Sequence, residues 1–474
     1  MSSFDLFLET AIINLMERTL TANTTKYLNE KVKVSGWADS VRSHSKIVFI
    51  DLRDMSGIIQ LVCSSELAKN IRPEWVIEVE GKVSPRPAKM VNPKIETGKI
   101  EISVEKINVL SEAKSLPFSV SGDGYDISEE KRMKYRYLDL RRPRMKRNMI
   151  ERQRVINFIR QYLINQSFIE IETPILTKST PEGARDFIVP SRMQPGKFYA
   201  LPQSPQQYKQ LLQIAGIEKY FQIARCFRDE DPRADRQAEF TQLDLEMSFL
   251  EQKDVMRINE KLIIDLIKKL YPEKRIQEIP FPVLSYKKAM EKYKTDRPDL
   301  RKDKNNKDLL AFCWVIDFPF FEKDENNKWT FTHNPFSAPK PEFLKNLLAK
   351  KNIKDILTSQ YDIVLNGFEI GGGSIRNHKP ERLEAVFEII GYKKAEIKEK
   401  FGHMLQAFEY GAPPHGGIAY GLDRFVSIIQ KEENIREVIA FPKTGDSRDL
   451  MMDSPSEVSV QQLKELKIKL DKKK

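Results

Sequence analysis

Apolar and polar residues alternate along the first 110 positions in a way that is typical of short β-strands. Five runs show the pattern, separated by Gly, Pro, Ser and Asn: residues 32–37, 46–53, 58–63, 76–83 and 100–109. Five short strands in about 80 residues predict a small β-barrel over residues 1–110. Phe49 and Gln60 are expected on its outer face, where a ring stacks a base and an amide reads a base edge. The alternative is that Phe49 belongs to the core of the barrel and that Gln60 is solvated without a binding role.

From residue 148 onward the pattern becomes mixed α and β. Apolar residues recur at helical spacing from Val155 to Leu163, and residues 168–173 then alternate as a strand that Pro174 ends. So large an apolar helix face predicts either core packing or a symmetric contact between two subunits.

The sequence Ser-Pro-Gln-Gln at 204–207 predicts the start of another helix. The serine is the expected N-cap, the proline takes the first helical position and the second glutamine completes a capping box, while Gly216 ends the helix. Gln206 and Lys209 are three residues apart and are therefore neighbours near the N-terminus, where the dipole and a cation favour an anion. A plain surface charge at Lys209 is the alternative.

Residues 220–249 have the pattern of a hairpin with a charged loop. Two strand-like runs flank residues 228–237, which contain four acidic residues and three arginines. Polar residues share one face of the returning run: Gln242, Asp244, Glu246 and Ser248. The loop suits a polyphosphate with its metal, and an ordinary half-exposed strand pair is the alternative.

Three consecutive glycines at 371–373 lie between Glu369 and Arg376. A guanidinium fixed beside bare backbone can grip a small carboxylic acid through two parallel hydrogen bonds. A glycine-rich surface turn with solvated charges is the alternative.

A second glycine-rich segment covers residues 413–424. Gly417 and Gly421 are predicted to lie one turn apart on a helix that presents Arg424. Because a glycine inside a helix costs about 1 kcal/mol, two of them indicate a function, with close helix packing as the alternative.

Composition narrows the class of protein. A chain of 474 residues with 40% hydrophobic content can form two or three domains, and it has no apolar run long enough to span a membrane. Its first residues show no basic leader before an apolar stretch, so we expect a cytoplasmic protein. The net charge of +11 favours polyanionic partners. Three widely spaced cysteines predict buried free thiols rather than a zinc cluster or disulfides.

Residues 111–147 are predicted to form a hinge between the β-rich N-terminal part and the mixed α and β part of the chain. Gly122 and Gly124 punctuate the segment, and residues 135–143 are dense in Arg and Tyr. These basic residues are expected either along a nucleic-acid backbone or in a solvated linker.

Four motifs, taken in order, resemble the signatures of class II aminoacyl-tRNA synthetases, and most closely those of bacterial-type aspartyl-tRNA synthetases. They are residues 180–186, 203–206, 226–231 and 421–424, so that the resemblance spans nearly the whole chain. The resemblance implies an α+β protein: an N-terminal OB-fold β-barrel that reads the anticodon, a hinge, and a catalytic domain over 148–474 with an antiparallel sheet flanked by helices. It also implies a homodimer through the long helix and Pro174.

The implied reaction has two steps. Aspartate and ATP, with Mg²⁺, form aspartyl-adenylate, and a ribose hydroxyl at the 3′ end of tRNA-Asp, with tRNA-Asn as a further candidate, then takes the aspartyl group. A carboxylate is already nucleophilic, so positioning and charge stabilisation are expected to carry the first step.

Residue by residue, the resemblance implies several groups of site residues. Aspartate would be bound by Glu182, Gln206, Lys209, Arg228, Asp244, His333 and Arg376. ATP would be bound by Arg228, Asp229, Glu230, Gln237, Glu369, Gly421, Leu422, Asp423 and Arg424, of which Arg228, Glu369 and Arg424 would be catalytic. Mg²⁺ would be bound by Asp362 and Glu369, as hard oxygen donors. The anticodon would contact Arg42, Phe49 and Gln60. Two alternatives apply to these roles. Asp362 and Asn366–Gly367 could simply belong to a β-hairpin and its turn, and His333 could be a surface histidine without a role in the site.

The chain departs from the family pattern at three places. Residues 298–314 leave no room for the large domain that bacterial members usually insert. After Gly36 and Trp37 the family commonly has a run of arginines, of which this chain keeps only Arg42. After His333, Asn334 stands where a second histidine is often found. Two other functions remain open: an asparaginyl-tRNA synthetase, and a synthetase-like RNA-binding protein without catalysis.

Overall fold

The computed structural model describes residues 17–179 and 183–471 of the chain. Glu182, expected in the aspartate site, therefore lies outside the described residues. The chain divides into two compact units, Met1–Ser119 and Val120–Lys474, which are described separately here.

The first unit is a closed β-barrel with strand order β1-β2-β3-β5-β4. Its elements are η1 (Thr21–Lys26), β1 (Lys31–His44), β2 (Ile47–Arg53), β3 (Ile58–Ser64), β4 (Val76–Pro85), η2 (Ala88–Met90) and β5 (Ile100–Ser111). All five predicted strands are confirmed, and β1 continues well beyond its expected end to pair with both β2 and β4. Alternate residues of β2 are buried, as with Val48, Ile50 and Leu52, because successive side chains point to opposite faces.

The segment expected as a hinge, 111–147, straddles the division between the units. From Val120 it belongs to the second unit and contains α1 (Glu129–Lys134) and α2 (Arg136–Asp139). Three of its arginines, Arg132, Arg136 and Arg142, are buried and donate hydrogen bonds to the Asp139 carboxylate, so they are not part of a solvated linker. Arg132 also binds Glu437, so these ion pairs hold the segment against the end of the chain.

The second unit is built on an eight-stranded sheet with order β12-β14-β17-β18-β19-β10-β9-β6. Its strands are β6 (Ile169–Glu170), β9 (Lys219–Phe227), β10 (Glu239–Ser248), β12 (Val283–Ser285), β14 (Phe312–Ile316), β17 (Gln360–Leu365), β18 (Phe368–Ile375) and β19 (His415–Gly421). The neighbouring pairs from β14 to β9 are antiparallel, as expected, whereas the short strands at both edges pair in parallel.

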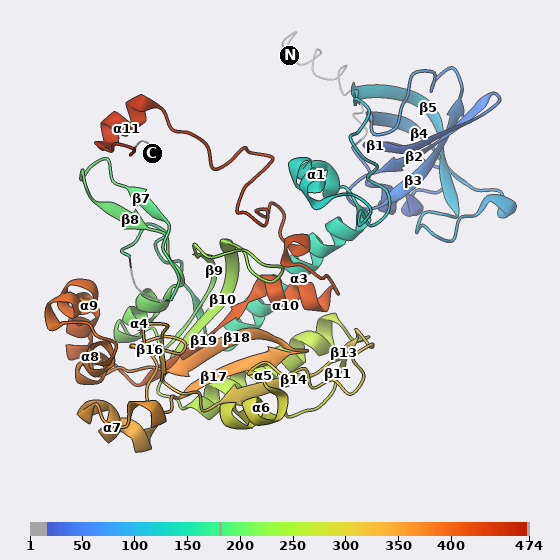
Figure 1. The fold of residues 1–474 in the computed structure, drawn as a ribbon. Helices are drawn as coiled ribbons and strands as arrows, with labels where there is room; N and C mark the ends of the chain where they lie inside the picture. Colours follow the sequence, from blue (N-terminus) through green and yellow to red (C-terminus); the bar gives the residue numbers. More distant parts are fainter. Residues whose placement is uncertain (1–16, 180–182, 472–474) are drawn as a thin grey trace, which may run out of the picture. The chain divides into compact units, whose positions relative to one another are not determined.

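Helices cover both faces of this sheet (Figure 1). The described helices beyond α2 are α3 (Pro143–Asn165), α4 (Gln206–Ile214), α5 (Gln252–Leu270), α6 (Tyr286–Tyr293), α7 (Leu344–Ala349), α8 (Pro380–Ile389), α9 (Lys394–Glu409), α10 (Leu422–Ile429) and α11 (Val460–Leu466). Short 3-10 turns are η3 (Pro341–Phe343), η4 (Ile353–Asp355) and η5 (Ile435–Val438). Short strand pairs are β7 (Ile188–Pro190) with β8 (Phe198–Ala200), β11 (Arg275–Ile276) with β13 (Leu309–Leu310), and β15 (Phe321–Lys323) with β16 (Trp329–Phe331).

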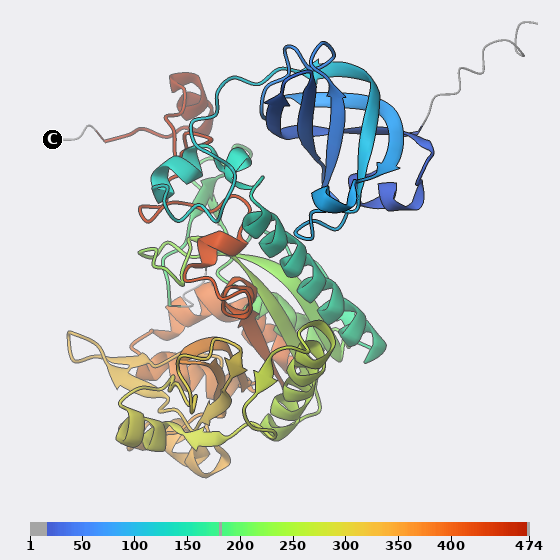
Figure 2. The same ribbon diagram turned by 90° about the vertical axis from the view of Figure 1, so that its right-hand side faces the viewer.

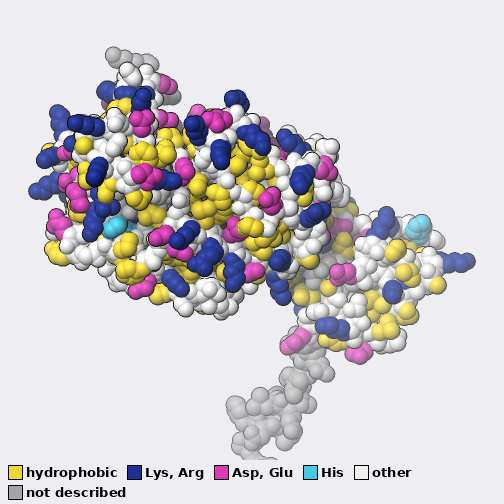
Figure 3. Space-filling view, turned by 90° about the horizontal axis from the view of Figure 1, so that it is seen from below, with side chains coloured by type: hydrophobic (Ala, Val, Ile, Leu, Met, Phe, Trp, Pro, Cys, Tyr) yellow, Lys and Arg dark blue, Asp and Glu magenta, His cyan; other side chains and the backbone are white. Residues whose placement is uncertain are grey.

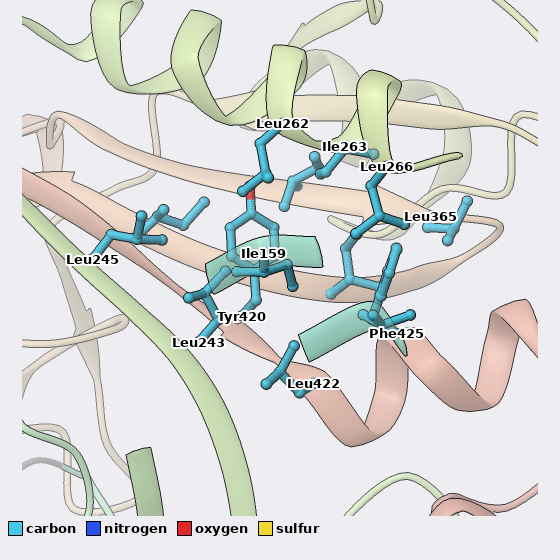
Figure 4. Close-up of a cluster of buried hydrophobic side chains, with 14 of the residues drawn as sticks. Ile159, Leu243, Leu245, Leu262, Ile263, Leu266, Leu365, Tyr420, Leu422 and Phe425 are labelled. Atoms are coloured by element: carbon cyan, nitrogen blue, oxygen red, sulfur yellow. The ribbon is translucent and has the colours of Figure 1, made fainter. Parts of the chain in front are cut away.

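The main core lies between the sheet and the helices α3, α5 and α10. Helices α3 and α5 lie side by side (Figure 2), and the close-up shows Ile159 of α3 and Leu262 of α5 against Tyr420 of β19 (Figure 4). Leu243 and Leu245 of β10 point into this core, which leaves the polar residues of β10 on the opposite face. That face is buried too, and it forms the floor of the candidate site.

The region around Gly417 is a strand and not the predicted helix. Gly417 pairs with Glu246 of β10 and Ser374 of β18, and only the residues after Gly421 are helical. The glycine is required by close strand packing, since a Cβ there would lie 1.9 Å from the Leu245 carbonyl oxygen. The start of α4 also differs from the prediction, because its N-cap is Pro205 and the Gln207 side chain contacts His403 instead of closing a capping box.

Other expectations concern what the chain lacks. The chain passes from α6 to β13 in a short connection around Asp299, without an intervening domain. None of the described helices has the length and apolar composition needed to cross a lipid bilayer. The three cysteines are free and buried, as predicted. On the face drawn in Figure 3, Lys and Arg side chains are interspersed with Asp and Glu, so the net positive charge is spread over this face.

Candidate active site

A polar pocket of about 520 Å³ opens on the face of the sheet opposite the main core. It is bounded by β10, β17, β18 and β19, by α4 and by the charged loop after β9. Of the residues predicted for the site, the pocket brings together Gln206, Lys209, Arg228, Glu230, Gln237, Asp244, His333, Asp362, Glu369, Arg376, Gly421, Asp423 and Arg424. Segments that lie far apart in the sequence thus meet at one cavity.

Four buried charged groups form the base of the pocket, each at most 3% exposed: Lys209, Asp244 and Arg376 line it, and Glu246 contacts Lys209 and Arg376 without lining it. Lys209 Nζ lies 2.6 Å from Asp244 and 3.2 Å from Glu246. Arg376 donates to both Glu246 oxygens, from Nε at 2.8 Å and from NH2 at 3.0 Å. The four charges sum to zero, which allows them to remain ionised away from water.

The pKa values of the two buried carboxyl groups shift in opposite directions. Burial alone would raise the pKa of Glu246, but the neighbouring Arg376 and Lys209 lower that pKa to about 2. The same burial raises the pKa of Asp244 against the pull of Lys209. Asp244 Oδ1 accepts from Lys209, while Asp244 Oδ2 is buried without a hydrogen-bond partner. An unpaired acceptor in the wall of a pocket indicates that a ligand donor completes it.

From the sequence we expected Arg376 to offer two parallel hydrogen bonds of its guanidinium group to a ligand. In the structure most of these donors are already taken. Glu246 holds the edge formed by Nε and NH2, and Ser374 Oγ accepts one hydrogen of NH1 at 2.9 Å. The role of Glu246 was missed, although its place on the polar face of the returning strand and the bare Gly417 opposite it were signals. A Cβ on Gly417 would lie 2.3 Å from Glu246 Oε2.

Asp362 of β17 and Glu369 of β18 form an acidic pair in the pocket wall. Burial and the nearby Asp362 raise the pKa of Glu369. Gln360 Nε2 donates to Asp362 Oδ1 at 2.8 Å, and His333 Nε2 lies 3.1 Å from Asp362 Oδ2. Burial lowers the pKa of His333, but the carboxylates outweigh it and bring the value to about 9.

This acidic pair fits a hard divalent cation. The Asp362 carboxylate raises the pKa of Glu369, which shows that negative charge is concentrated here, and both groups are oxygen donors of the kind that Mg²⁺ takes together with phosphate oxygens and water. Within residues 17–179 and 183–471, no group of three or more His, Cys, Asp or Glu side chains forms a complete metal cage. The geometry thus suits a cation that arrives with its ligand.

Arg228 and Arg424 bring positive charge to the pocket. Both Nε atoms are buried without a hydrogen-bond partner, which suits an incoming anion. The Arg228 guanidinium lies 5.1 Å from the centre of the Phe240 ring. Arg424 donates to the Glu369 backbone oxygen and pairs with Asp235 of the charged loop at 3.1 Å.

Several predicted ATP-site residues have other contacts. Gln237 lines the pocket, but its Oε1 accepts from the Lys443 backbone nitrogen at 2.9 Å. The Asp423 carboxylate accepts from the Thr241 backbone nitrogen at 2.8 Å and pairs with Arg152. Two do not line the pocket: Asp229 pairs with Arg185 at 3.6 Å, and Leu422 is 1% exposed in the main core (Figure 4).

The residues predicted to contact the anticodon share the outer face of the barrel. Arg42 pairs across the strands with Phe49 and binds the Asp51 carboxylate at 2.7 and 3.1 Å. Phe49 is half-buried, as expected for a ring on an outer face. Gln60 differs from the expectation because it is only 8% exposed and donates to Glu101 at 2.9 Å.

Two pocket residues, Gln242 and Gln360, were not assigned to the site from the sequence. Gln242 follows the alternation of the returning strand, which was a usable signal. Gln360 lies in the uniformly buried strand β17, and nothing in its local sequence marks it as the residue that holds Asp362.

Comparisons with known proteins agree over nearly the whole chain. Residues 128–445 match the model of class II tRNA synthetases (D, K and N), and residues 32–110 match an OB-fold nucleic acid binding domain. An aspartate–tRNA(Asp/Asn) ligase of Caldanaerobacter subterraneus is 42% identical over 577 aligned positions, covering 94% of this chain and 97% of the relative. One from Thermoanaerobacter sp. is equally similar over 579 positions. Both alignments are longer than this 474-residue chain, so the relatives contain segments that it lacks.

Solved structures agree in fold. A putative aspartyl-tRNA synthetase from Leishmania major superposes with a TM-score of 0.75 at 20% identity, covering 91% of this chain and 94% of that one. An asparaginyl-tRNA synthetase from Pyrococcus horikoshii, complexed with asparaginyl-adenylate, superposes with a TM-score of 0.72 at 23% identity, covering 91% and 99%.

Proposed function

Because the chain belongs to the class II tRNA synthetases of the D, K and N group and has an OB-fold domain of the nucleic-acid-binding kind, we propose that it is an aspartyl-tRNA synthetase. It joins L-aspartate to ATP and transfers the aspartyl group to the 3′ end of tRNA. The names of its relatives include both tRNA(Asp) and tRNA(Asn), and we propose both as acceptors.

The observation that carries the choice of amino acid is the group of buried charges in the pocket floor. Lys209 and the NH1 group of Arg376 supply donors for the side-chain carboxylate of aspartate. The unpaired Asp244 Oδ2 supplies an acceptor for the α-ammonium group. An asparagine amide would place an NH₂ group against these cationic donors and leave one of them unpaired in the interior, so asparagine is rejected.

In the first step, an oxygen of the aspartate α-carboxylate attacks the α-phosphorus of ATP. A new P–O bond forms, the bond to the β-phosphate oxygen breaks, and pyrophosphate leaves. Arg228 stabilises the charge that develops on the α-phosphate, and Arg424 binds the phosphates that leave. Both arginines have a buried, unpartnered Nε–H ready for these contacts.

Asp362 and Glu369 would hold Mg²⁺ with the phosphates of ATP. The bound cation would neutralise phosphate charge and help orient the pyrophosphate leaving group. Gln360 keeps Asp362 in position by donating to its Oδ1.

In the second step, a hydroxyl of the terminal ribose of tRNA attacks the aspartyl carbonyl carbon, the acyl–phosphate bond breaks, and AMP leaves with the hydroxyl proton on its phosphate. The barrel binds the anticodon through its outer face, where Phe49 offers a ring for stacking and Arg42 a cation for phosphate. Glu101 already binds the Gln60 amide, so Gln60 reads a base only by exchanging this partner.

The same fold supports a homodimer. Apolar side chains on and after α3 are 40–52% exposed: Ile150, Ile164, Ile169, Ile175 and Leu176. Such a surface, next to the short parallel edge strand β6, is suited to a two-fold contact with a second copy of the chain.

Pyrophosphate exchange tests the first step directly. Purified protein should incorporate labelled pyrophosphate into ATP with aspartate and much less with asparagine, and it should then aspartylate transcripts of tRNA-Asp and tRNA-Asn. Equal exchange with asparagine would indicate an asparaginyl-tRNA synthetase. Binding of tRNA without any exchange would indicate a non-catalytic RNA-binding protein.

A further inference from the structure

A chain of hydrogen bonds runs from the pocket wall into the interior. Gln206 Nε2 lies 2.9 Å from Gln210 Oε1, and Gln210 Nε2 lies 3.1 Å from His415 Nε2. His415 Nδ1 lies 2.7 Å from the carbonyl oxygen of Pro413. Gln206 is 8% exposed, whereas Gln210 and His415 are completely buried, so water does not compete for these bonds.

The direction of this chain is fixed at Pro413. A carbonyl oxygen only accepts, so His415 Nδ1 carries the hydrogen. In a neutral imidazole Nε2 is then the acceptor, and the Gln210 amide must donate to it through its NH₂ group. That leaves Gln210 Oε1 to accept from the NH₂ group of Gln206. Gln206 Oε1, the other terminal atom of the same planar amide, therefore takes no part in this chain of hydrogen bonds, and Gln206 lines the pocket.

His415 is neutral because of its surroundings. Burial, with smaller contributions from Arg376 and His378, lowers the pKa of His415 to about 4, against the opposing effects of Glu246 and the Pro413 carbonyl. Its ring centroid lies 6.3 Å from that of His378.

We propose that His415, acting through Gln210, is a positioning residue that holds Gln206 with its carbonyl oxygen towards the α-ammonium group of the bound amino acid. This inference rests on the proposed aspartyl-tRNA synthetase function. Gln206 Oε1 and the unpaired Asp244 Oδ2 line the same pocket as two acceptors, and an ammonium group is a donor only. A reversed glutamine would present NH₂ to the ammonium group and repel it.

Substrate analogues separate this role from general damage to the pocket. Succinate has both carboxylates of aspartate but no ammonium group. The variants His415→Leu and Gln210→Met should raise the KM for aspartate in pyrophosphate exchange about tenfold, the size of one hydrogen bond to a charged group. The KM for ATP and the inhibition constant of succinate should not change.

Two matched variants serve as controls. His415→Gln keeps an acceptor near the position of Nε2 and should restore most of the affinity for aspartate. Gln213→Met removes another buried glutamine of α4. Gln213 accepts a hydrogen bond from Ser248 and has no part in the hydrogen bonds that link Gln206 to His415, so this variant should leave the KM for aspartate as in the wild type. A parallel loss of succinate binding, or an unchanged KM for aspartate in both test variants, would overturn the proposal.

A measurement on the unaltered protein keeps the proposal testable if the variants do not fold. The chain has only five histidines, so their ¹⁵N resonances can be assigned. His415 should be neutral at pH 7 with its hydrogen on Nδ1, and a hydrogen on Nε2 would overturn the proposal. Absence of aspartate-dependent exchange in the wild type would refute the proposed function instead, and would leave the tautomer result intact.

Discussion

Glu246 and Arg376 form a two-pronged ion pair that is closed off from water, although 130 positions separate them in the sequence. The pair orients the Arg376 guanidinium before any substrate is bound, and its charges are balanced locally by Lys209 and Asp244. Pre-ordered charges of this kind lose little entropy when a ligand binds, which favours selective binding of a small acid.

Glu246→Gln should destabilise the protein in a pH-dependent way. The pKa of Glu246 is lowered from about 4.5 to about 2 on folding, so its contribution is fully present above pH 4.5 and is lost as the pH falls towards 2. At pH 7 the contribution is of order 3 kcal/mol. Thermal denaturation of both proteins should show a gap in midpoint that narrows from pH 5 to pH 3. A gap that is constant with pH would contradict the ion-pair argument.

Gly417→Ala should disrupt the sheet beneath the pocket. The added Cβ would lie 1.9 Å from the Leu245 carbonyl oxygen, and this backbone atom cannot move without separating β10 from β19. We expect loss of soluble folded protein or of exchange activity by more than a hundredfold. Gly402→Ala in α9 is the matched control, because its nearest neighbour is 3.6 Å away and a helical alanine is about 1 kcal/mol more favourable. The melting temperature measured by circular dichroism should therefore rise slightly in the Gly402→Ala control.

Asp235→Asn should strengthen ATP binding. Asp235 pairs with Arg424 at 3.1 Å in the part-exposed mouth of the pocket and so competes with phosphate for the same guanidinium. A pair of this exposure is worth about 0.2–1 kcal/mol, so the KM for ATP should fall by about 1.4- to fivefold. The exchange assay at saturating aspartate measures this change. A higher KM would show instead that Asp235 helps to hold the loop in its binding form.

Asp362→Asn should raise the Mg²⁺ concentration needed for activity. The substitution removes one of the two carboxylate charges proposed to bind the cation, while its shape is retained between Gln360 and His333. Titration of exchange activity with Mg²⁺, at fixed Mg²⁺–ATP, should show a midpoint shifted about tenfold or more. An unchanged midpoint would place the cation elsewhere.

The sequence predicted the fold correctly where the alternation of apolar and polar residues along one strand determines the structure. The barrel strands and the two faces of β10 follow from the two-residue period of side chains. The segment around Gly417 was predicted wrongly, because glycine spacing alone does not distinguish a helix from a strand packed against two neighbours. The charged segment 135–143 was also misjudged, since Asp139 and residues near the end of the chain neutralise its arginines.

The site was predictable only as far as single residues carry recognisable chemistry. Arg228, Asp362 and Arg424 were assigned through the family resemblance, and they line one pocket. What was missed are partners: Glu246 for Arg376, and Gln360 for Asp362. A partner is defined by strand register across the sheet, and register depends on the packing of the whole domain.

The glycines of the pocket floor limit how the enzyme can be redesigned. A Cβ on Gly373 would lie 2.0 Å from the Gly417 carbonyl oxygen, and one on Gly371 would lie 2.9 Å from that of Ala419. Because rigid backbone blocks both positions, no side chain can be added at these two glycines to reshape the floor for a different amino acid. A new substrate would therefore have to be accommodated by changing side chains that already line the pocket, such as Gln206 and Lys209 of α4.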